Sequence, residues 1–277
     1  MPAGAQQLTT RLSTRFASLK REGRAGLVAY IMASDPDHET CFEILRGLPA
    51  AGADVIELGF PFSDPMADGV SIQLAAQRAL KAGGSLRKTL DLARRFRAED
   101  QTTPLILMGY ANPVEQMSYD VLSREMASAG ADGIIIVDLP PEEDAPLRAA
   151  FAPNELSIIR LATPTTDDNR LTKVLEGASG FLYYVSVAGV TGTNAATSEA
   201  VQNAVARLKR ATELPIAVGF GVRTPEAAHA IAQDADAVVV GSAFVDEIAA
   251  GGSEQAVERV LRKVKQLSEA VRTARGQ

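Results

Sequence analysis

The 277-residue sequence has little of several residues that carry common chemistry. Its one cysteine, Cys41, excludes an internal disulfide or a cluster of thiolate metal ligands and fits a reducing compartment such as the cytoplasm. With 28 basic and 34 acidic side chains the formal charge is −6, which argues against a basic face for nucleic acid. No apolar run approaches the roughly 18 residues of a membrane span. The sequence therefore predicts a soluble, cytoplasmic protein without a nucleic-acid or membrane partner.

Histidine and lysine are missing from the positions where many enzymes need them. His38 lies near the start of a predicted helix and His229 within another, which disfavours a histidine base at a strand end and a histidine-rich metal site. The lysines fall in predicted helices or their flanks, whereas a Schiff-base aldolase needs a lysine desolvated inside its site. We expect no metal, and chemistry that uses neither metal nor lysine.

The chain contains eight short apolar runs separated by helical patterns. Short runs rich in Val, Ile and Leu predict buried parallel strands at 27–33, 54–59, 104–109, 132–137, 156–162, 181–187, 214–219 and 236–241. Helical patterns lie between them at 37–50, 85–99, 119–129, 166–176, 198–211 and 253–273, with a further helix start at Thr224-Pro225-Glu226 and weak signals at 142–151 and 245–249. Eight such units without a linker favour an α/β fold, a single (β/α)₈ TIM barrel, over the alternative of an open Rossmann-like sheet.

The first residues predict one more helix. Leu8, Leu12, Phe16 and Leu19 recur at helical spacing, so residues 1–24 are expected to hold a helix that covers part of the core. Residues 25–277 then form the barrel, and 1–277 a single domain. In such a barrel, functional side chains gather where strands end and loops begin.

Two carboxylates follow the second predicted strand. Glu57 closes an apolar run, where partial desolvation would raise the pKa of its carboxyl group and suit it to moving protons. Instead of a catalytic role, Glu57 could form an ion pair with a basic neighbour. Asp68 precedes Gly69 and could serve only a local turn. Asp35 and Asp138 also follow strands, and they are expected to make turns or helix caps.

Glycine marks the last three predicted strand ends. Gly189 and Gly192 follow the sixth strand, Gly219 and Gly221 the seventh, and Gly241-Ser242 the eighth. Glycine allows main-chain N–H groups to approach a phosphate, and a helix N-terminus there adds positive potential. These junctions lie in the phosphate-binding region of many barrels, so they predict a phosphate site, although each glycine alone could serve a turn.

A long motif supplies a family resemblance. Residues 57–69 read ELGFPFSDPMADG and are followed by Ser71-Ile72-Gln73, which closely resembles the signature of the tryptophan synthase alpha chain family. The similarity covers nearly the whole chain, including segments 35–37, 108–113, 138–140, 189–192, 219–222 and 241–242. It implies a lyase that needs no cofactor and splits indole-3-glycerol phosphate into indole and glyceraldehyde 3-phosphate, in the last step of tryptophan biosynthesis.

The resemblance also implies a role for individual residues. Glu57 matches the family's catalytic acid and base, which protonates indole C3 and takes a proton from the glycerol hydroxyl group, and Asp68 matches the group that accepts a hydrogen bond from the indole N–H. The family's phosphate-binding positions are matched by Gly192, Gly221, Gly241 and Ser242. Its indole-pocket positions are matched by Tyr30, Met108 and Tyr183. Thr191 matches a position in a mobile loop that closes over Asp68.

A partner is implied by the same resemblance. Members of the family bind a beta chain, which carries pyridoxal phosphate, in an α₂β₂ complex, and indole passes to it through a tunnel. Segments 61–68 and 110–113 match the contact regions. The sequence departs from some members at Val187-Ala188, where they carry Arg and a small polar residue, which removes an expected charge contact to the mobile loop.

Two other functions compete with this one. Another phosphate-binding barrel enzyme, such as indole-glycerol-phosphate synthase or a sugar-phosphate isomerase, would have a similar rhythm, but the synthase relies on lysines at strand ends. A binding module that only activates a beta chain is the other alternative, and the presence of both Glu57 and Asp68 argues against it.

Overall fold

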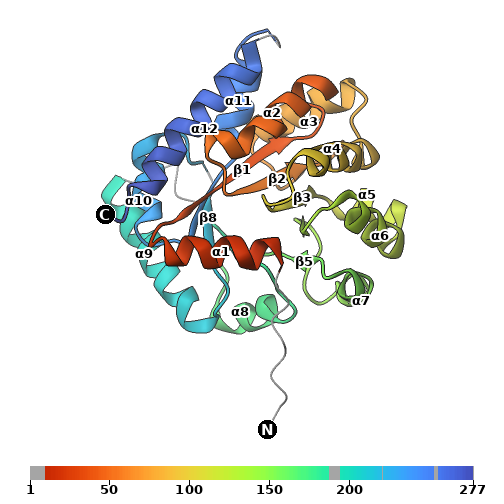
Figure 1. Cartoon of the computed structure of the whole chain (residues 1–277). Helices are drawn as coiled ribbons and strands as arrows, with labels where there is room; N and C mark the ends of the chain where they lie inside the picture. The colour runs from red at the N-terminus through yellow and green to blue at the C-terminus, as the bar shows by residue number, and fades with distance from the viewer. Residues whose placement is uncertain (1–9, 187–193, 220, 253–254, 277) are drawn as a thin grey trace.

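The computed structural model describes residues 10–186, 194–219, 221–252 and 255–276 (Figure 1). All of its paired strands are parallel and belong to one sheet with the order β5-β4-β3-β2-β1-β9-β8-β7-β6. The strands are β1 (Gly26–Met32), β2 (Val55–Gly59), β3 (Leu105–Gly109), β4 (Gly133–Ile136), β5 (Ser157–Ile158), β6 (Arg160–Ala162), β7 (Leu182–Val185), β8 (Ile216–Gly219) and β9 (Ala237–Val240).

The two ends of this sheet are parts of a single barrel strand. β5 pairs with β4 through Ser157 and Ile158, whereas β6 pairs with β7 from Arg160 onward, and only Ile159 separates β5 from β6. Residues 157–162 therefore join both edges, and the nine strand segments make an eight-stranded barrel. The predicted (β/α)₈ TIM barrel is confirmed, and the alternative of an open sheet is wrong.

The helices surround the barrel at the predicted positions, with two additions. Their bounds are α1 (Arg11–Arg21), α2 (His38–Ala51), α3 (Val70–Lys81), α4 (Leu86–Glu99), α5 (Ala111–Met117), α6 (Tyr119–Ala129), α7 (Ala145–Phe151), α8 (Asp168–Leu175), α9 (Asn194–Ala211), α10 (Pro225–Ala232), α11 (Ser242–Ala249) and α12 (Ala256–Arg272), with a 3₁₀ turn η1 (Ala152–Asn154). Thr224 caps α10 as expected, since its hydroxyl oxygen accepts a hydrogen bond from Ala227 N.

The sequence did not predict α3 or α5. In α3, Val70 and Leu74 are exposed, so the apolar residues do not mark one buried face, and Gly69 supplies no side-chain cap. Helix α5 is capped from outside its own sequence, because a carboxylate oxygen of Asp138 accepts a hydrogen bond of 2.7 Å from Ala111 N. Asp138 therefore acts as a cap, as expected, but for a helix that precedes it in the chain.

Every barrel strand sends side chains into one central core. The core contains, in chain order, Val28, Val55, Ile106, Ile135, Ile159, Tyr183, Ala217, Ala237 and Val239. Because side chains alternate along a strand, the neighbouring residues face outward and form separate cores with the surrounding helices. The barrel is packed inside and outside, and its inward positions include Tyr30, Glu57 and Met108, two residues further along their strands.

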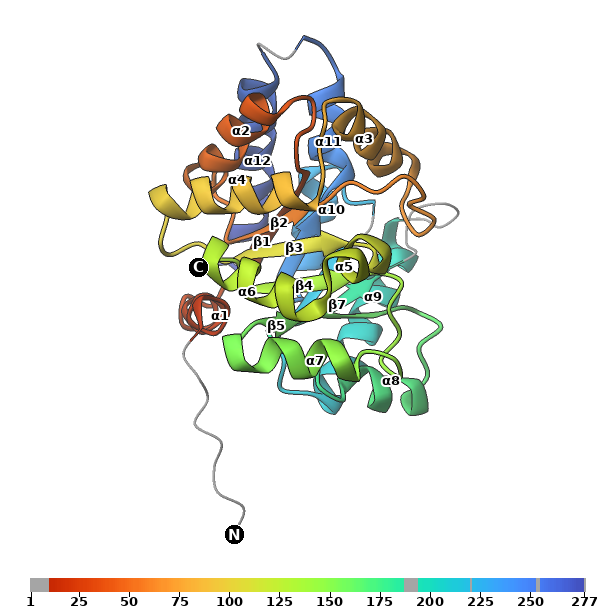
Figure 2. The ribbon, with the colours of Figure 1, turned by 90° about the vertical axis from the view of Figure 1, so that its right-hand side faces the viewer.

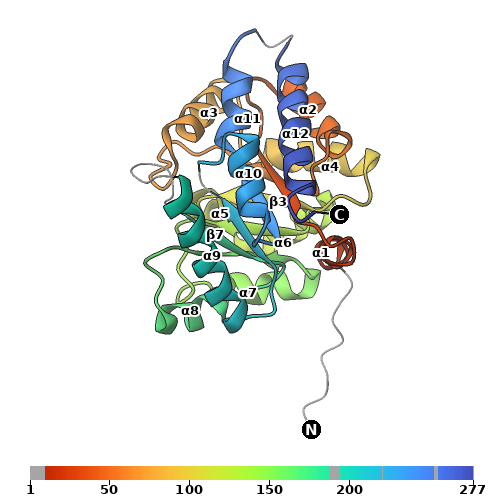
Figure 3. The same ribbon diagram turned by 90° about the vertical axis from the view of Figure 1, so that its left-hand side faces the viewer.

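Helix α1 closes the amino-terminal end of this interior. Leu12, Phe16 and Leu19 are buried in the barrel core, with the rings of Phe16 and Phe181 5.7 Å apart. Figures 2 and 3 show α1 at one end of the barrel, whereas α3 lies toward the other. The extra N-terminal helix is confirmed at Arg11–Arg21, and Leu8 lies outside the described residues.

An Ala-Asp pair repeats before three of the strands. Asp54, Asp132 and Asp236 precede β2, β4 and β9, and each has the same reciprocal contact with the start of a neighbouring strand. Their N–H groups donate to the carbonyl oxygens of Leu27, Leu105 and Ile216, and their carboxylates accept from the N–H groups of those same residues. These carboxylates fix where adjacent strands begin relative to one another.

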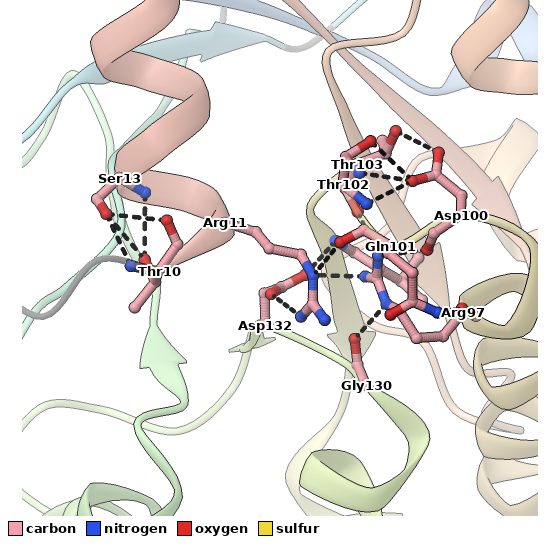
Figure 4. Close-up of polar contacts among 11 residues, drawn as sticks. Thr10, Arg11, Ser13, Arg97, Asp100, Gln101, Thr102, Thr103, Gly130 and Asp132 are labelled. Atoms are coloured by element: carbon pink, nitrogen blue, oxygen red, sulfur yellow. Dashed lines mark hydrogen bonds and ion pairs between the residues drawn. The ribbon is translucent and has the colours of Figure 1, made fainter.

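A cation completes each of these contacts, and Figure 4 shows the network at Asp132. Arg97 lies 3.1 Å from one of its oxygens and Arg11 of α1 lies 2.9 Å from the other. Arg97 also donates to the carbonyl oxygen of Gly130, and Arg11 donates to that of Gln101. The network ties α1 to the barrel through a carboxylate that is itself almost fully buried.

We expect Asp132→Asn to lower the free energy of unfolding by about 3 kcal/mol, because it leaves the buried Arg97 guanidinium without a countercharge. Urea unfolding followed by circular dichroism measures the change. Glu258→Gln, which removes an exposed partner of Arg262, is the matched control and should leave the midpoint where it is. Equal effects of the two substitutions would contradict this account of Asp132.

Candidate active site

A cavity of about 580 Å³ opens at the carboxyl ends of the strands. Its walls come from inward positions of six strands and from the loops that follow them, at the end of the barrel opposite α1. The predicted site residues Tyr30, Glu57, Asp68, Met108, Tyr183, Gly221, Gly241 and Ser242 all line it. Thr191 and Gly192 lie outside the described residues, as does the pair Val187-Ala188.

Glu57 is the buried acid of this cavity. It occupies the middle of β2, between Tyr30 of β1 and Ile106 of β3 in the strand register, and it is 1% exposed. Its Oε1 atom has no hydrogen-bond partner among the described residues, and burial raises the pKa of the carboxyl group to about 8. A buried carboxylate without a donor or countercharge is unfavourable, so Glu57 is protonated at neutral pH. The alternative that it pairs with a basic neighbour is wrong.

Asp68 lies on the loop between β2 and α3 and is less enclosed. Burial raises the pKa of its carboxyl group to about 6, while the nearby Tyr110 hydroxyl group opposes that rise. The same hydroxyl oxygen accepts a hydrogen bond of 3.0 Å from Ala67 N, and Gln73 donates to the carbonyl oxygen of Asp68 at 2.8 Å. These contacts hold the loop against the barrel, with Asp68 ionised at neutral pH.

Two tyrosines, Tyr30 and Tyr183, line the same cavity as these acids. Burial, with the charges of Asp68 and Glu57, raises the pKa of both Tyr30 and Tyr183 well above its usual value, so both hydroxyl groups stay neutral. Glycine makes room for each ring. A Cβ atom at Gly59 would lie 2.3 Å from the Tyr30 hydroxyl oxygen, and one at Gly219 would lie 2.9 Å from that of Tyr183.

Gly221, Gly241 and Ser242 form another part of the wall, where a Cβ atom at Gly241 would lie 3.2 Å from the Tyr30 ring. Gly221 has a φ of +71°, and a Cβ atom placed there would meet no atom within 4 Å, so its backbone faces open space. Ser242 begins α11, where Gly241 provides no side-chain cap. Phe244 N donates to the carbonyl oxygen of Gly241, whereas the N–H groups of Ser242 and Ala243 have no carbonyl partner within the helix. They leave donors beside the cavity at the positive end of the helix dipole.

Other polar residues at the strand ends are occupied elsewhere. The Asp35 N–H group closes a turn onto the carbonyl oxygen of Met32, so the predicted turn at Asp35 is confirmed. Its carboxylate caps no helix, because both oxygens accept hydrogen bonds of 2.7 Å from Arg78 of α3, and Asp37 caps α2. Arg160 faces outward and pairs with Asp144 before α7. Cys41 is buried in the core between the barrel and its helices.

In the described ranges no group of three or more His, Cys, Asp or Glu side chains is placed to hold a metal ion, and no helix is long and apolar enough to cross a membrane.

Comparison with known proteins decides the family. The model of a family described as tryptophan synthase alpha chain matches residues 16–272. The chain belongs to the tryptophan synthase alpha chain family. Curated alpha chains from Caulobacter sp. (strain K31) and Caulobacter vibrioides are each 58% identical over 267 residues, covering 96% of this chain and 97% of theirs.

Solved structures of the same family share the fold. The tryptophan synthase alpha subunit of Legionella pneumophila has a TM-score of 0.89 at 37% identity, covering 95% of this chain and 99% of that one. A chain of Mycobacterium tuberculosis tryptophan synthase has a TM-score of 0.86 at 34% identity, covering 96% and 99%. Membership of the tryptophan synthase alpha chain family makes this chain a carbon–carbon lyase of tryptophan biosynthesis, and it removes the rival barrel enzymes.

Several lining residues were not predicted as site residues. Leu161 and Thr163 reach the cavity from the split strand and the loop after it, and Ser71 reaches it from the start of α3. Arg223 follows Gly221 by two residues, and it is the one cation among the described lining residues. Their positions in the sequence place these residues near the carboxyl ends of the strands. Which of them face the cavity depends on the conformation of the loops, and the family motif does not specify that conformation.

The buried carboxyl group has a consequence for stability. The pKa of Glu57 is about 8 in the folded chain against a reference of 4.5, so the wild-type free energy of unfolding falls as the pH rises through that interval. We expect Glu57→Gln to gain stability relative to wild type between pH 5 and pH 8, by roughly 2 kcal/mol or more. Urea unfolding at both pH values measures this. The exposed control Glu269→Gln should show no such trend, and a constant difference for Glu57→Gln would refute the pKa shift.

Proposed function

We propose that this cavity cleaves indole-3-glycerol phosphate to indole and glyceraldehyde 3-phosphate by a retro-aldol reaction. The observation that supports it most is the pairing of a desolvated, unpartnered acid, Glu57, with an ionised one, Asp68, in one cavity. The bond to be broken joins the indole ring to the glycerol chain. The ring must first become an electron sink, which requires a proton donor and a group that stabilises positive charge.

The walls suit a planar, mostly apolar ring. Tyr30, Met108 and Tyr183 line the cavity, as do the apolar side chains of Leu161 and Val185. Indole has one polar atom, its N–H, and the Asp68 carboxylate is the acceptor we assign to it. An ionised carboxylate at this position stabilises the positive charge that develops on the ring nitrogen when C3 is protonated.

Glu57 serves as acid and then as base. Its carboxyl group donates a proton to indole C3, which turns the ring into a cation. The resulting carboxylate takes the proton from the hydroxyl group on the adjoining glycerol carbon, and the electrons of the carbon–carbon bond move into the ring. Indole and an aldehyde result, and Glu57 is again protonated. One residue therefore completes the cycle without a net change in its own charge.

The phosphate group lies at the other part of the cavity in this proposal. The backbone N–H groups of Gly221 and of the α11 N-terminus, with the Ser242 hydroxyl group, are its donors. Gly192 is assigned to the same group, and Thr191 to a loop that closes over Asp68, from the family motif. Closure would exclude water from the charged intermediate.

We also propose a partner and a setting for the chain. Residues 1–277 are taken as one domain that joins a beta chain in a cytoplasmic α₂β₂ complex and passes indole to it. Pyridoxal phosphate belongs to the beta chain, and this chain needs no cofactor. Segment 61–68 is one contact region in this proposal, and the strongly exposed side chain of Met66 lies within it.

We expect Glu57→Gln and Asp68→Asn each to lower kcat for indole release at least about 100-fold, since each removes a group that acts in the transition state. Indole formed from indole-3-glycerol phosphate is measured with added beta chain, and Glu269→Gln is the control. Indole release by wild type that survives both substitutions would overturn the assigned roles. Wild type that releases none, yet stimulates the beta chain, would instead favour the binding module.

The two carboxyl groups also set a pH dependence. Activity requires Asp68 ionised and Glu57 protonated, so kcat/KM should rise as the pH passes about 6 and fall as it passes about 8. Rates of indole release between pH 5 and pH 9.5, in buffers of constant ionic strength, test this. The residual activity of Asp68→Asn should lack the acid limb. Activity that keeps rising above pH 8 would show that Glu57 does not act first as an acid.

A further inference from the structure

Arg223 stands apart from the other residues of the cavity. The remaining ionisable groups on its described walls are the acids Glu57 and Asp68 and the neutral tyrosines. A phosphate dianion that enters this space brings further negative charge. Neutral backbone donors offset part of that charge, and a guanidinium group at the same place offsets more of it.

The Arg223 side chain is held by two contacts. One terminal nitrogen pairs with Asp246 of α11, and the other donates a hydrogen bond of 3.2 Å to the Ser71 hydroxyl oxygen of α3. A guanidinium group has five N–H donors, so these contacts leave others uncommitted among the described residues. The side chain is also about half exposed, at 52%. It is oriented and still able to bind an anion.

These contacts join the two functional parts of the cavity. Asp246 lies one helical turn after Ser242 on α11, and Ser71 lies three residues after Asp68. Helices α11 and α3 pack against each other, as Figures 2 and 3 show. The guanidinium group therefore links the loop after β8, the middle of α11 and the start of α3, which follows Asp68.

We propose that Arg223 binds the substrate phosphate and, through Ser71, holds the Asp68 segment in position when the phosphate is bound. This inference rests on the proposed function. Asp246 orients the guanidinium group, and the phosphate oxygens accept its uncommitted N–H groups. Arg223 is thus a phosphate-binding residue, whereas Ser71 and Asp246 are positioning residues. The backbone donors alone recognise a phosphate by shape, and Arg223 adds selectivity for the doubly charged form.

The two roles can be separated by substitution. Arg223→Ala should weaken the binding of inorganic phosphate about tenfold, the effect of losing one charge-assisted contact, and raise KM by a similar factor. Arg223→Lys should recover part of the affinity as a point charge without the fork of donors. Ser71→Ala keeps the cation, so phosphate affinity should stay at the wild-type value while kcat falls several-fold. Arg262→Ala, an exposed cation on α12, is the control.

The measurements use the full chain with its beta chain for kinetics, and calorimetric titration of the full chain with inorganic phosphate for affinity. Unchanged phosphate affinity and KM in Arg223→Ala would overturn the binding role, and an unchanged kcat in Ser71→Ala would overturn the link to Asp68. Should Arg223→Ala unfold, Arg223→Lys with a wild-type unfolding midpoint carries the same test. The titration needs no turnover, so it is independent of whether indole-3-glycerol phosphate is the substrate.

Discussion

The closure of the sheet by residues 157–162 is the constraint on which the site depends. Its first part hydrogen-bonds to β4 and its second part to β7, with Ile159 between them. Without that double pairing, β4 and β7 would lie toward opposite edges of an open sheet. Met108 of β3 and Tyr183 of β7 could then not line one cavity, and Glu57 would face a surface. Closure turns alternate residues of every strand inward. The enclosed space holds the barrel core, and at the carboxyl ends of the strands it removes water from around Glu57.

Polar groups at the two ends of the barrel differ in whether their hydrogen bonds are satisfied. At the amino-terminal end, Asp54 and Asp132 are buried and Asp236 is partly exposed, and each has both a backbone donor and a cation. At the carboxyl end, Glu57 has an oxygen without a partner, and α11 begins without a side-chain cap. Satisfied polar networks stabilise and fix geometry, whereas unsatisfied groups cost stability and remain available to a ligand. The fold's stability and its chemistry are thus located at different ends of the same strands.

The sequence predicted what depends on local pattern. Apolar runs placed the barrel strands and most helices within a few residues, because a parallel strand buried on both faces needs such a run. It missed α3, whose exposed Val70 and Leu74 blur the apolar stripe, and α5, whose cap comes from Asp138 after the next strand. The same limit applies to the site. The family motif identified the residues around the cavity, but the Asp35–Arg78 pair, the room that Gly219 gives Tyr183 and the inward placement of Arg223 all depend on partners remote in sequence.

The different surroundings of Glu57 and Asp68 determine which carboxyl group is protonated and which is ionised at neutral pH. Glu57 is on a barrel strand, almost fully buried and without a hydrogen-bond donor among the described residues, so burial raises the pKa of its carboxyl group to about 8. Asp68 is on a loop, partly open, with the Tyr110 hydroxyl group beside it, and it ionises at about pH 6. Between these values one carboxyl group is an acid and the other an anion, although their reference pKa values are nearly equal. Exchanging the positions would exchange the roles, because the ionised group must be the one that solvent and a hydroxyl donor can stabilise. Burial and the Tyr110 hydroxyl group together keep one carboxyl group protonated and the other ionised, and the proposed carbon–carbon cleavage requires that division.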